Sequence, residues 1–98
     1  MINEAVIDNT LSKLERALSI AYMTLSKINS GSVHVDNNLK NEIEYYDDLI
    51  ATAFKISEEL KKEGNFFKSK KYRRFNDLTY ELFDVVKRIK KGAGYIYL

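Results

Sequence analysis

The sequence contains no cysteine, no proline and no tryptophan, and its only histidine is His34. The absence of cysteine excludes disulfide bonds and thiolate metal sites. The absence of proline leaves nothing that would break a long helix by removing a backbone donor. Because the residue types that most often act as nucleophile, general base or metal ligand are nearly missing, we expect no catalytic site, no metal and no other cofactor.

Long apolar runs are missing as well. No segment approaches the roughly 18 consecutive apolar residues that a transmembrane helix needs. The first residues, Met1 to Glu4, lack the basic start and apolar run of a secretory signal. We therefore expect a cytoplasmic protein with no membrane partner.

What the sequence does contain is typical of a folded helical domain. Apolar residues make up 45% of the 98 residues and charged residues 31%, a balance that favours a folded chain over a disordered one. The length suits one domain covering residues 1–98. Residues 92–98 form an apolar C-terminal tail of that domain.

Three segments, about 3–29, 37–63 and 66–91, carry apolar residues at alternating spacings of four and three. The first stripe contains Ile7, Leu11, Leu14, Leu18, Ala21, Leu25 and Ile28; the second contains Leu39, Ile43, Tyr46, Ile50, Ala53, Ser57 and Leu60; the third contains Phe75, Leu78, Leu82, Val85 and Ile89. This spacing puts each stripe on one face of a helix. It predicts an all-α fold of three long antiparallel helices forming a heptad-seamed bundle.

The ends of these helices also have sequence signals. Asn3 is the predicted N-cap of the first helix, and Asp36, Asn37 or Asn38 is the N-cap of the second. The third helix begins at Phe66 or at Lys70. A second stripe on the middle segment contains Tyr45, Leu49, Thr52 and Ile56, and it predicts that the middle helix is buried on two sides.

Four large apolar residues, Ile20, Met23, Phe54 and Phe83, fall outside the main stripes. Either they thicken the core, or they form a face that pairs with a second copy or with another protein. A homodimer that completes a four-helix arrangement is one natural outcome.

Charge is distributed unevenly along the chain. Residues 1–64 hold 7 Lys and Arg against 11 Asp and Glu, a balance of −4, whereas residues 65–98 hold 9 against 3, a balance of +6. The excess is concentrated in a basic segment in which five of seven residues are cationic: Lys68, Lys70, Lys71, Tyr72, Arg73 and Arg74, with Ser69 between them. Cations at the start of a helix oppose its dipole by a few tenths of a kcal/mol each, so stability alone does not account for them.

Three interpretations of this segment stay open. It can contact nucleic acid or another polyanion, because Lys and Arg neutralise phosphates and exposed aromatics stack on bases. It can bind an acidic protein partner. It can also be a solvated face that matches the carboxylates Glu58, Glu59 and Glu63 at the end of the second helix.

The C-terminal tail is the second candidate surface. Its last four residues, Tyr95, Ile96, Tyr97 and Leu98, are all apolar or aromatic, whereas free termini are usually polar. The tail therefore either folds back on the bundle or docks into a partner.

Together these features favour a non-enzymatic accessory or adaptor protein. In this hypothesis the basic segment binds a larger assembly that handles nucleic acid. The alternative is a protein–protein interaction module or inhibitor that acts through apolar helix faces and the tail, without nucleic-acid contact.

Overall fold

The computed structural model describes residues 3–31, 35–64 and 66–94. They form three α-helices, α1 (Glu4–Asn29), α2 (Asn37–Lys62) and α3 (Lys70–Gly92), and a single 3₁₀ turn, η1 (Phe66–Lys68). The described residues include no strand. The predicted all-α three-helix bundle is confirmed.

Each long helix begins at a residue whose side chain accepts a hydrogen bond from a free backbone N–H of the first turn. Asn3 accepts from the amide of Ala5 at 2.8 Å, and Asp36 accepts from the amide of Leu39 at 2.9 Å. Ser69 accepts from the amide of Tyr72 at 3.2 Å. This last cap explains why η1 and α3 are separate elements rather than one helix starting at Phe66.

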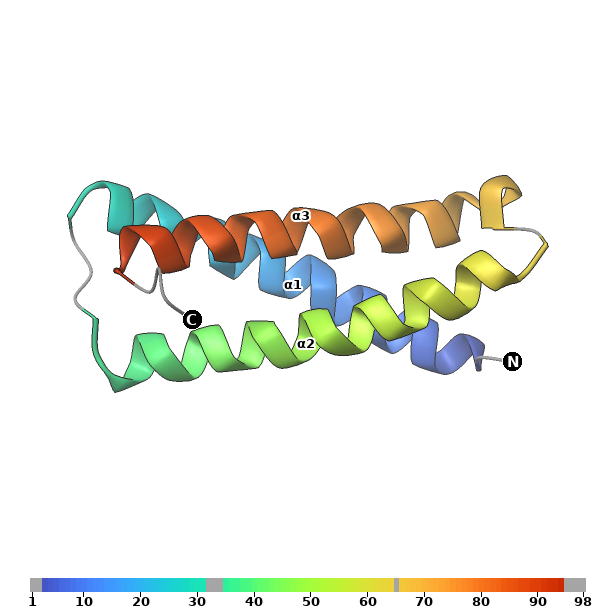
Figure 1. Cartoon of the computed structure of the whole chain (residues 1–98), viewed down its shortest axis with the longest axis horizontal. Coiled ribbons are helices and arrows are strands. Elements are labelled where there is room, and N and C mark those ends of the chain that lie inside the picture. Colours follow the sequence, from blue (N-terminus) through green and yellow to red (C-terminus); the bar gives the residue numbers. More distant parts are fainter. Residues whose placement is uncertain (1–2, 32–34, 65, 95–98) are drawn as a thin grey trace.

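The helices form an elongated bundle of 45 × 21 × 20 Å. In Figure 1, α2 and α3 run side by side along its length and α1 crosses obliquely behind them. Glu4 of α1 contacts the first turn of α3, and Ile28 of α1 lies against Gly92 at the other end. Thus α1 and α3 are parallel, and α2 is antiparallel to both.

The predicted stripes form the core. All seven stripe residues of α2 are buried, as are four of the five in α3, with Leu78 partly covered. In α1, Thr10, Ala17 and Thr24 are buried as well, while Leu11, Leu25 and Ile28 are only partly covered. The apolar spacing therefore located the core correctly on α2 and α3. On α1 the centre of the buried side is displaced by about one residue from the predicted stripe, toward Thr10, Ala17 and Thr24.

The prediction that the middle helix, α2, is buried on two sides holds only in part. The helix that packs extensively against both others is α3, while α1 and α2 contact each other least. On the second stripe of α2, Leu49 and Ile56 are buried but Tyr45 and Thr52 are exposed. The side of the bundle between α1 and α2 is consequently open.

None of the helices in the described part of the chain combines the length and the apolar character needed to cross a membrane.

Candidate functional site

The basic segment divides into two sets of side chains in the structure. Lys71, Tyr72 and Arg74 face α1 and bond its carboxylates. Lys68, Lys70 and Arg73 are exposed and form no ion pair with any described residue. The six residues therefore do not act as one surface.

Lys71 and Tyr72 fasten the start of α3 to the start of α1. The Lys71 ammonium lies 2.6 Å from a carboxylate oxygen of Glu4 and 2.5 Å from one of Asp8, and the Tyr72 hydroxyl donates to Glu4 at 2.8 Å. The hydrogen bond from Lys71, followed by that from Tyr72, holds the pKa of Glu4 below its ordinary value. The bonds to Asp8 and Glu4 raise the pKa of Lys71. Because Tyr72 is buried, its ring is not available for stacking on a base.

Arg74 makes a third link to α1, since its guanidinium lies 2.9 Å from a carboxylate oxygen of Glu15. The interpretation that the basic segment pairs with the carboxylates at the end of α2 is therefore wrong for Arg74, whose partner lies on α1. Glu58 and Glu59 instead pair with Lys61 and Lys62 one turn along their own helix. The crossing of α1 over α3 brings the α1 carboxylates within reach first.

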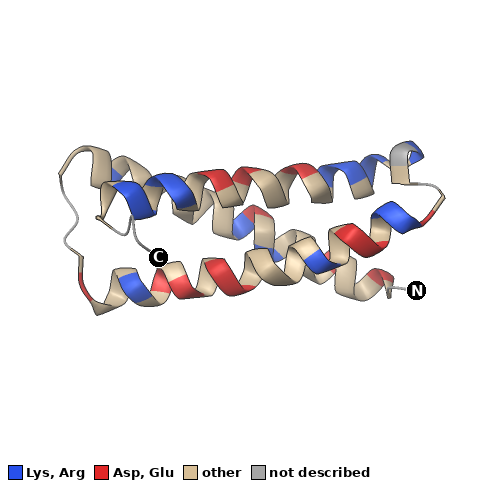
Figure 2. Cartoon of the chain, in the orientation of Figure 1, with Lys and Arg blue, Asp and Glu red and all other residues tan. Residues whose placement is uncertain are grey.

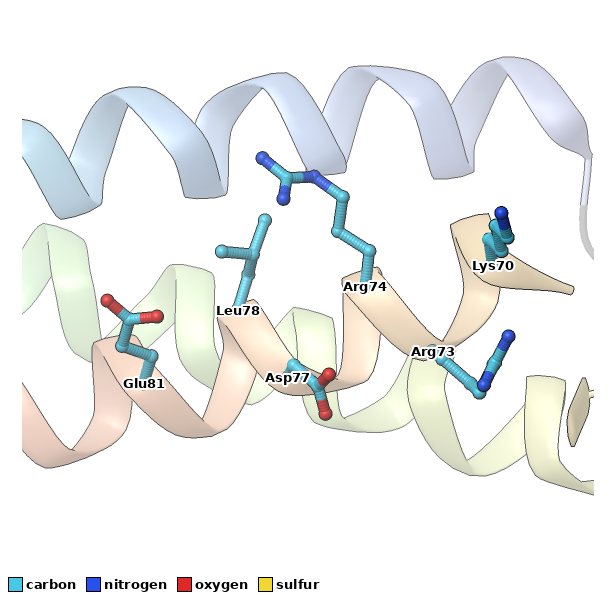
Figure 3. A pocket seen from close by; sticks show the side chains of 6 residues that line it. All are labelled: Lys70, Arg73, Arg74, Asp77, Leu78 and Glu81. Carbon is cyan, nitrogen blue, oxygen red and sulfur yellow. The ribbon is translucent and has the colours of Figure 1, made fainter.

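Beside this contact lies an open hollow of about 380 Å³, lined by Lys70, Arg73, Arg74, Asp77, Leu78 and Glu81. Figure 3 shows the Arg74 and Leu78 side chains pointing toward α1, with Asp77 between them along α3 and Glu81 beyond Leu78. Glu81 also accepts a hydrogen bond from the Tyr22 hydroxyl of α1 at 2.7 Å. The hollow thus carries charges of both signs.

The same alternation of charge extends along α3. Cations occupy both ends of the helix, and Asp77, Glu81 and Asp84 lie between them (Figure 2). A duplex or a long single strand laid along α3 would have its phosphates next to this central acidic block. The free cations are therefore suited to a contact at one end of the bundle only.

A different cluster of aromatic side chains lies where α2 and α3 meet. The Phe54 ring packs edge-on against Tyr80, with centroids 5.1 Å apart, and against Phe83, at 5.8 Å. Lys61 lies over the Tyr80 ring at 5.7 Å, and Lys87 lies over the Phe83 ring at 5.4 Å. We call Phe54, Tyr80 and Phe83 the aromatic face.

The aromatic face is incompletely covered. Tyr80 is 49% exposed and Phe83 41% exposed, while Phe54 is half-buried beneath them. The sequence singled out Phe54 and Phe83 as lying off the main stripes but missed Tyr80. Tyr80, Phe83 and Lys87 follow each other at spacings of three and four, which is a helical signal; the approach of Phe54 from α2 has no such signal.

The structure leaves some of the features noted in the sequence undescribed. No group of three or more His, Cys, Asp or Glu side chains that could hold a metal ion occurs among residues 3–31, 35–64 and 66–94. The single histidine, His34, and the predicted docking residues Tyr95, Ile96, Tyr97 and Leu98 lie outside the described residues.

Comparison of the chain with protein-family models, with curated proteins and with solved structures gave no match. Its function must therefore be inferred from its own surfaces.

Proposed function

We propose that this chain is a non-enzymatic accessory or adaptor protein of the cytoplasm that binds a protein partner through the aromatic face. The observation that carries the proposal is the exposure of Tyr80 and Phe83 above Phe54. Aromatic rings supply large contact area and are enriched among the residues that dominate binding energy at protein interfaces. A chain with one histidine and no cysteine offers little for catalysis in comparison.

The charges around the aromatic face favour an acidic partner. Lys87 lies over the Phe83 ring and has no carboxylate partner within the described part of the chain. The Lys61 ammonium lies 3.6 Å from a carboxylate oxygen of Glu58. Because both side chains of this pair are exposed, the pair is weak. A partner segment with an apolar anchor flanked by Asp or Glu would cover the rings and neutralise both lysines. An amphipathic helix, which presents its apolar side to the partner surface, is one segment of this kind.

Selection from a displayed library of amphipathic helical peptides, randomised on both faces, tests this proposal. We expect the enriched peptides to carry a Leu or aromatic anchor beside carboxylates. Their affinity should fall at least about tenfold for the Tyr80→Ser/Phe83→Ser variant, because truncating central anchor residues costs more than about 1 kcal/mol each.

Tyr22→Ser is the matched control, because Tyr22 is 46% exposed but bonds Glu81 on the α1–α3 side of the bundle. Enriched peptides that bind the Tyr80→Ser/Phe83→Ser variant as tightly as the wild type would refute the proposal. So would a selection that enriches Lys-rich and Glu-rich peptides equally.

The second candidate function is contact with nucleic acid through the basic segment, as part of a larger assembly. The observation in its favour is that Lys68, Lys70 and Arg73 are exposed at the start of α3, where they oppose the helix dipole and have no described carboxylate partner. This reduced set is smaller than the one the sequence suggested.

A salt titration of binding to labelled single- and double-stranded DNA and RNA tests this second candidate. Three phosphate contacts predict a slope of log K against log[salt] of about −2 to −3. The slope should vanish in Lys68→Glu/Lys70→Glu/Arg73→Glu, which leaves the links of Lys71 and Arg74 to α1 intact, and persist in the charge-matched control Lys40→Glu/Lys55→Glu/Lys91→Glu. Absence of binding by the wild type at low salt would eliminate nucleic-acid contact.

A further inference from the structure

The side of the bundle between α1 and α2 is the least closed part of the molecule. These two helices contact each other less than either contacts α3. Between them lies a hollow of about 210 Å³, which is lined by Thr10 and Lys13 of α1 and by Tyr45, Asp48, Leu49 and Thr52 of α2. This side is separate from the aromatic face, which lies between α2 and α3.

Half-exposed apolar side chains gather along this opening. Ile20 and Met23 of α1 and Tyr45 of α2 are between 47% and 59% exposed. Ile20 lies one turn before Thr24, which donates to Glu42 of α2, and Tyr45 lies three residues after Glu42. Met23 lies three residues after Ile20, on the same side of α1, so the three side chains lie at a similar level of the bundle, next to the contact between α1 and α2. We call Ile20, Met23 and Tyr45 the α1–α2 patch.

The charges beside the patch are opposite on its two helices. Every carboxylate of α1, namely Glu4, Asp8 and Glu15, bonds a cation of α3. The cations of α1 are Lys13, which lines the hollow, and Arg16 and Lys27, whose helical spacing from Lys13 puts them on the same side of α1; none of them forms an ion pair with a described residue. The bordering side of α2 carries Asp48, also without an ion pair in the described ranges.

We infer that the α1–α2 patch is the interface of a homodimer. A two-fold axis parallel to the helices places α1 of one protomer over α2 of its partner, and the same contacts then occur twice. Ile20 and Met23 then cover the partner's Tyr45, and Lys13 and Arg16 approach the partner's Asp48. A two-fold axis across the helices would instead stack α1 on α1 and oppose like charges, which costs energy.

The size of this side is sufficient for a stable dimer. The extents of the bundle, 45 × 21 Å, give one side an outline of about 950 Å², which leaves room for the roughly 800 Å² per partner of a standard specific interface. The dimer leaves both copies of the aromatic face exposed, so a bivalent partner would bind it more tightly than a monovalent one.

Sedimentation equilibrium with charge-swapped variants tests the dimer. We expect the wild type to approach about 23 kDa, twice the 11.4 kDa of one chain. Lys13→Glu/Arg16→Glu alone and Asp48→Lys alone should each raise the dimer Kd at least about tenfold, because each opposes like charges twice. A mixture of the two variants should dimerise again, because both contacts of the heterodimer then pair opposite charges.

Lys70→Glu/Arg73→Glu is the matched control, since it reverses two cations on α3 and should leave the dimer unchanged. A wild type that stays at 11.4 kDa up to millimolar concentration would overturn the inference. A dimer that resists both charge reversals but is lost in Tyr80→Ser/Phe83→Ser would overturn it too, because it would place self-association on the aromatic face. The monomeric charge variants should still bind the selected helical peptides through the aromatic face, so loss of the dimer and failure of the proposed function can be told apart.

Discussion

A cluster around the Glu42 carboxylate links α1 and α2 by hydrogen bonds. One of its oxygens accepts from the Thr24 hydroxyl at 2.6 Å and from the Tyr46 hydroxyl at 2.7 Å. Tyr46 and Thr24 are buried, and Glu42 is half-buried. Because α1 and α2 otherwise contact each other little, we expect this cluster to contribute measurably to the free energy of unfolding.

Tyr46→Phe removes one hydroxyl and keeps the packing of the ring. A hydrogen bond to a charged acceptor contributes about 1.5–3 kcal/mol, and the partial exposure of Glu42 reduces this to about 1–2 kcal/mol. For a domain of this size the loss corresponds to a fall in Tm of roughly 4–16 °C. Urea and thermal unfolding followed by circular dichroism measure both quantities, with Tyr80→Phe as the exposed control.

Glu42→Leu should be more harmful than Tyr46→Phe, because it leaves two hydroxyl donors of Thr24 and Tyr46 without their acceptor. The triple variant Thr24→Val/Glu42→Leu/Tyr46→Phe should recover much of the loss, since replacing all partners by apolar groups removes the unsatisfied donors. A change below about 0.5 kcal/mol in Tyr46→Phe, the level of ordinary surface substitutions, would refute the reasoning. A triple variant less stable than Glu42→Leu would refute it as well.

Four further outcomes are expected. Burial, followed by the bond to Glu42, raises the pKa of Tyr46 above its ordinary value of 10, so stability should fall as the pH rises past 10 and fall less in Tyr46→Phe. The pKa of Glu4 is lower in the folded chain than its ordinary value of 4.5, so the ionised carboxylate stabilises the fold above pH 4.5, and this contribution is lost as the pH falls through the folded pKa. The difference in urea midpoint between wild type and Glu4→Gln should therefore shrink from pH 7 to pH 3. Ser57→Ala should cost about 1 kcal/mol in urea unfolding, because the buried Ser57 hydroxyl donates to Asn76 of α3 at 2.6 Å. A methyl group on Gly92 would meet Cγ2 of Ile28 at 2.5 Å, so a double-mutant cycle should find Gly92→Ala more favourable in an Ile28→Ala background than in the wild type.

The local features of this fold could be predicted because they depend on neighbours in sequence. Asn3 and Asp36 are N-caps because a short polar side chain reaches an amide two or three residues ahead. The spacing of four and three fixes which side of each helix is apolar. The start of α3 was ambiguous, because Phe66 and Lys70 were both possible first residues of the third helix. The hydrogen bond that the Ser69 side chain accepts identifies Lys70 as the start.

The candidate site could be predicted only in part. The sequence located the basic segment, but it could not separate Lys71 and Arg74, which bond α1, from Lys70 and Arg73, which face solvent. These residues lie within one turn of each other, and their different roles arise only once α1 occupies a particular side of α3.

The sequence by itself therefore determined three helices, their apolar sides and their ends, apart from the start of α3. Only the tertiary structure decided that α3 is the helix packed on both others, that Phe54 meets Tyr80 and Phe83, and that the opening lies between α1 and α2. The physical reason is that all three apolar stripes share one period, so periodicity cannot say which stripe covers which. That choice depends on how side chains of different sizes fit together and on which charges meet when the helices cross.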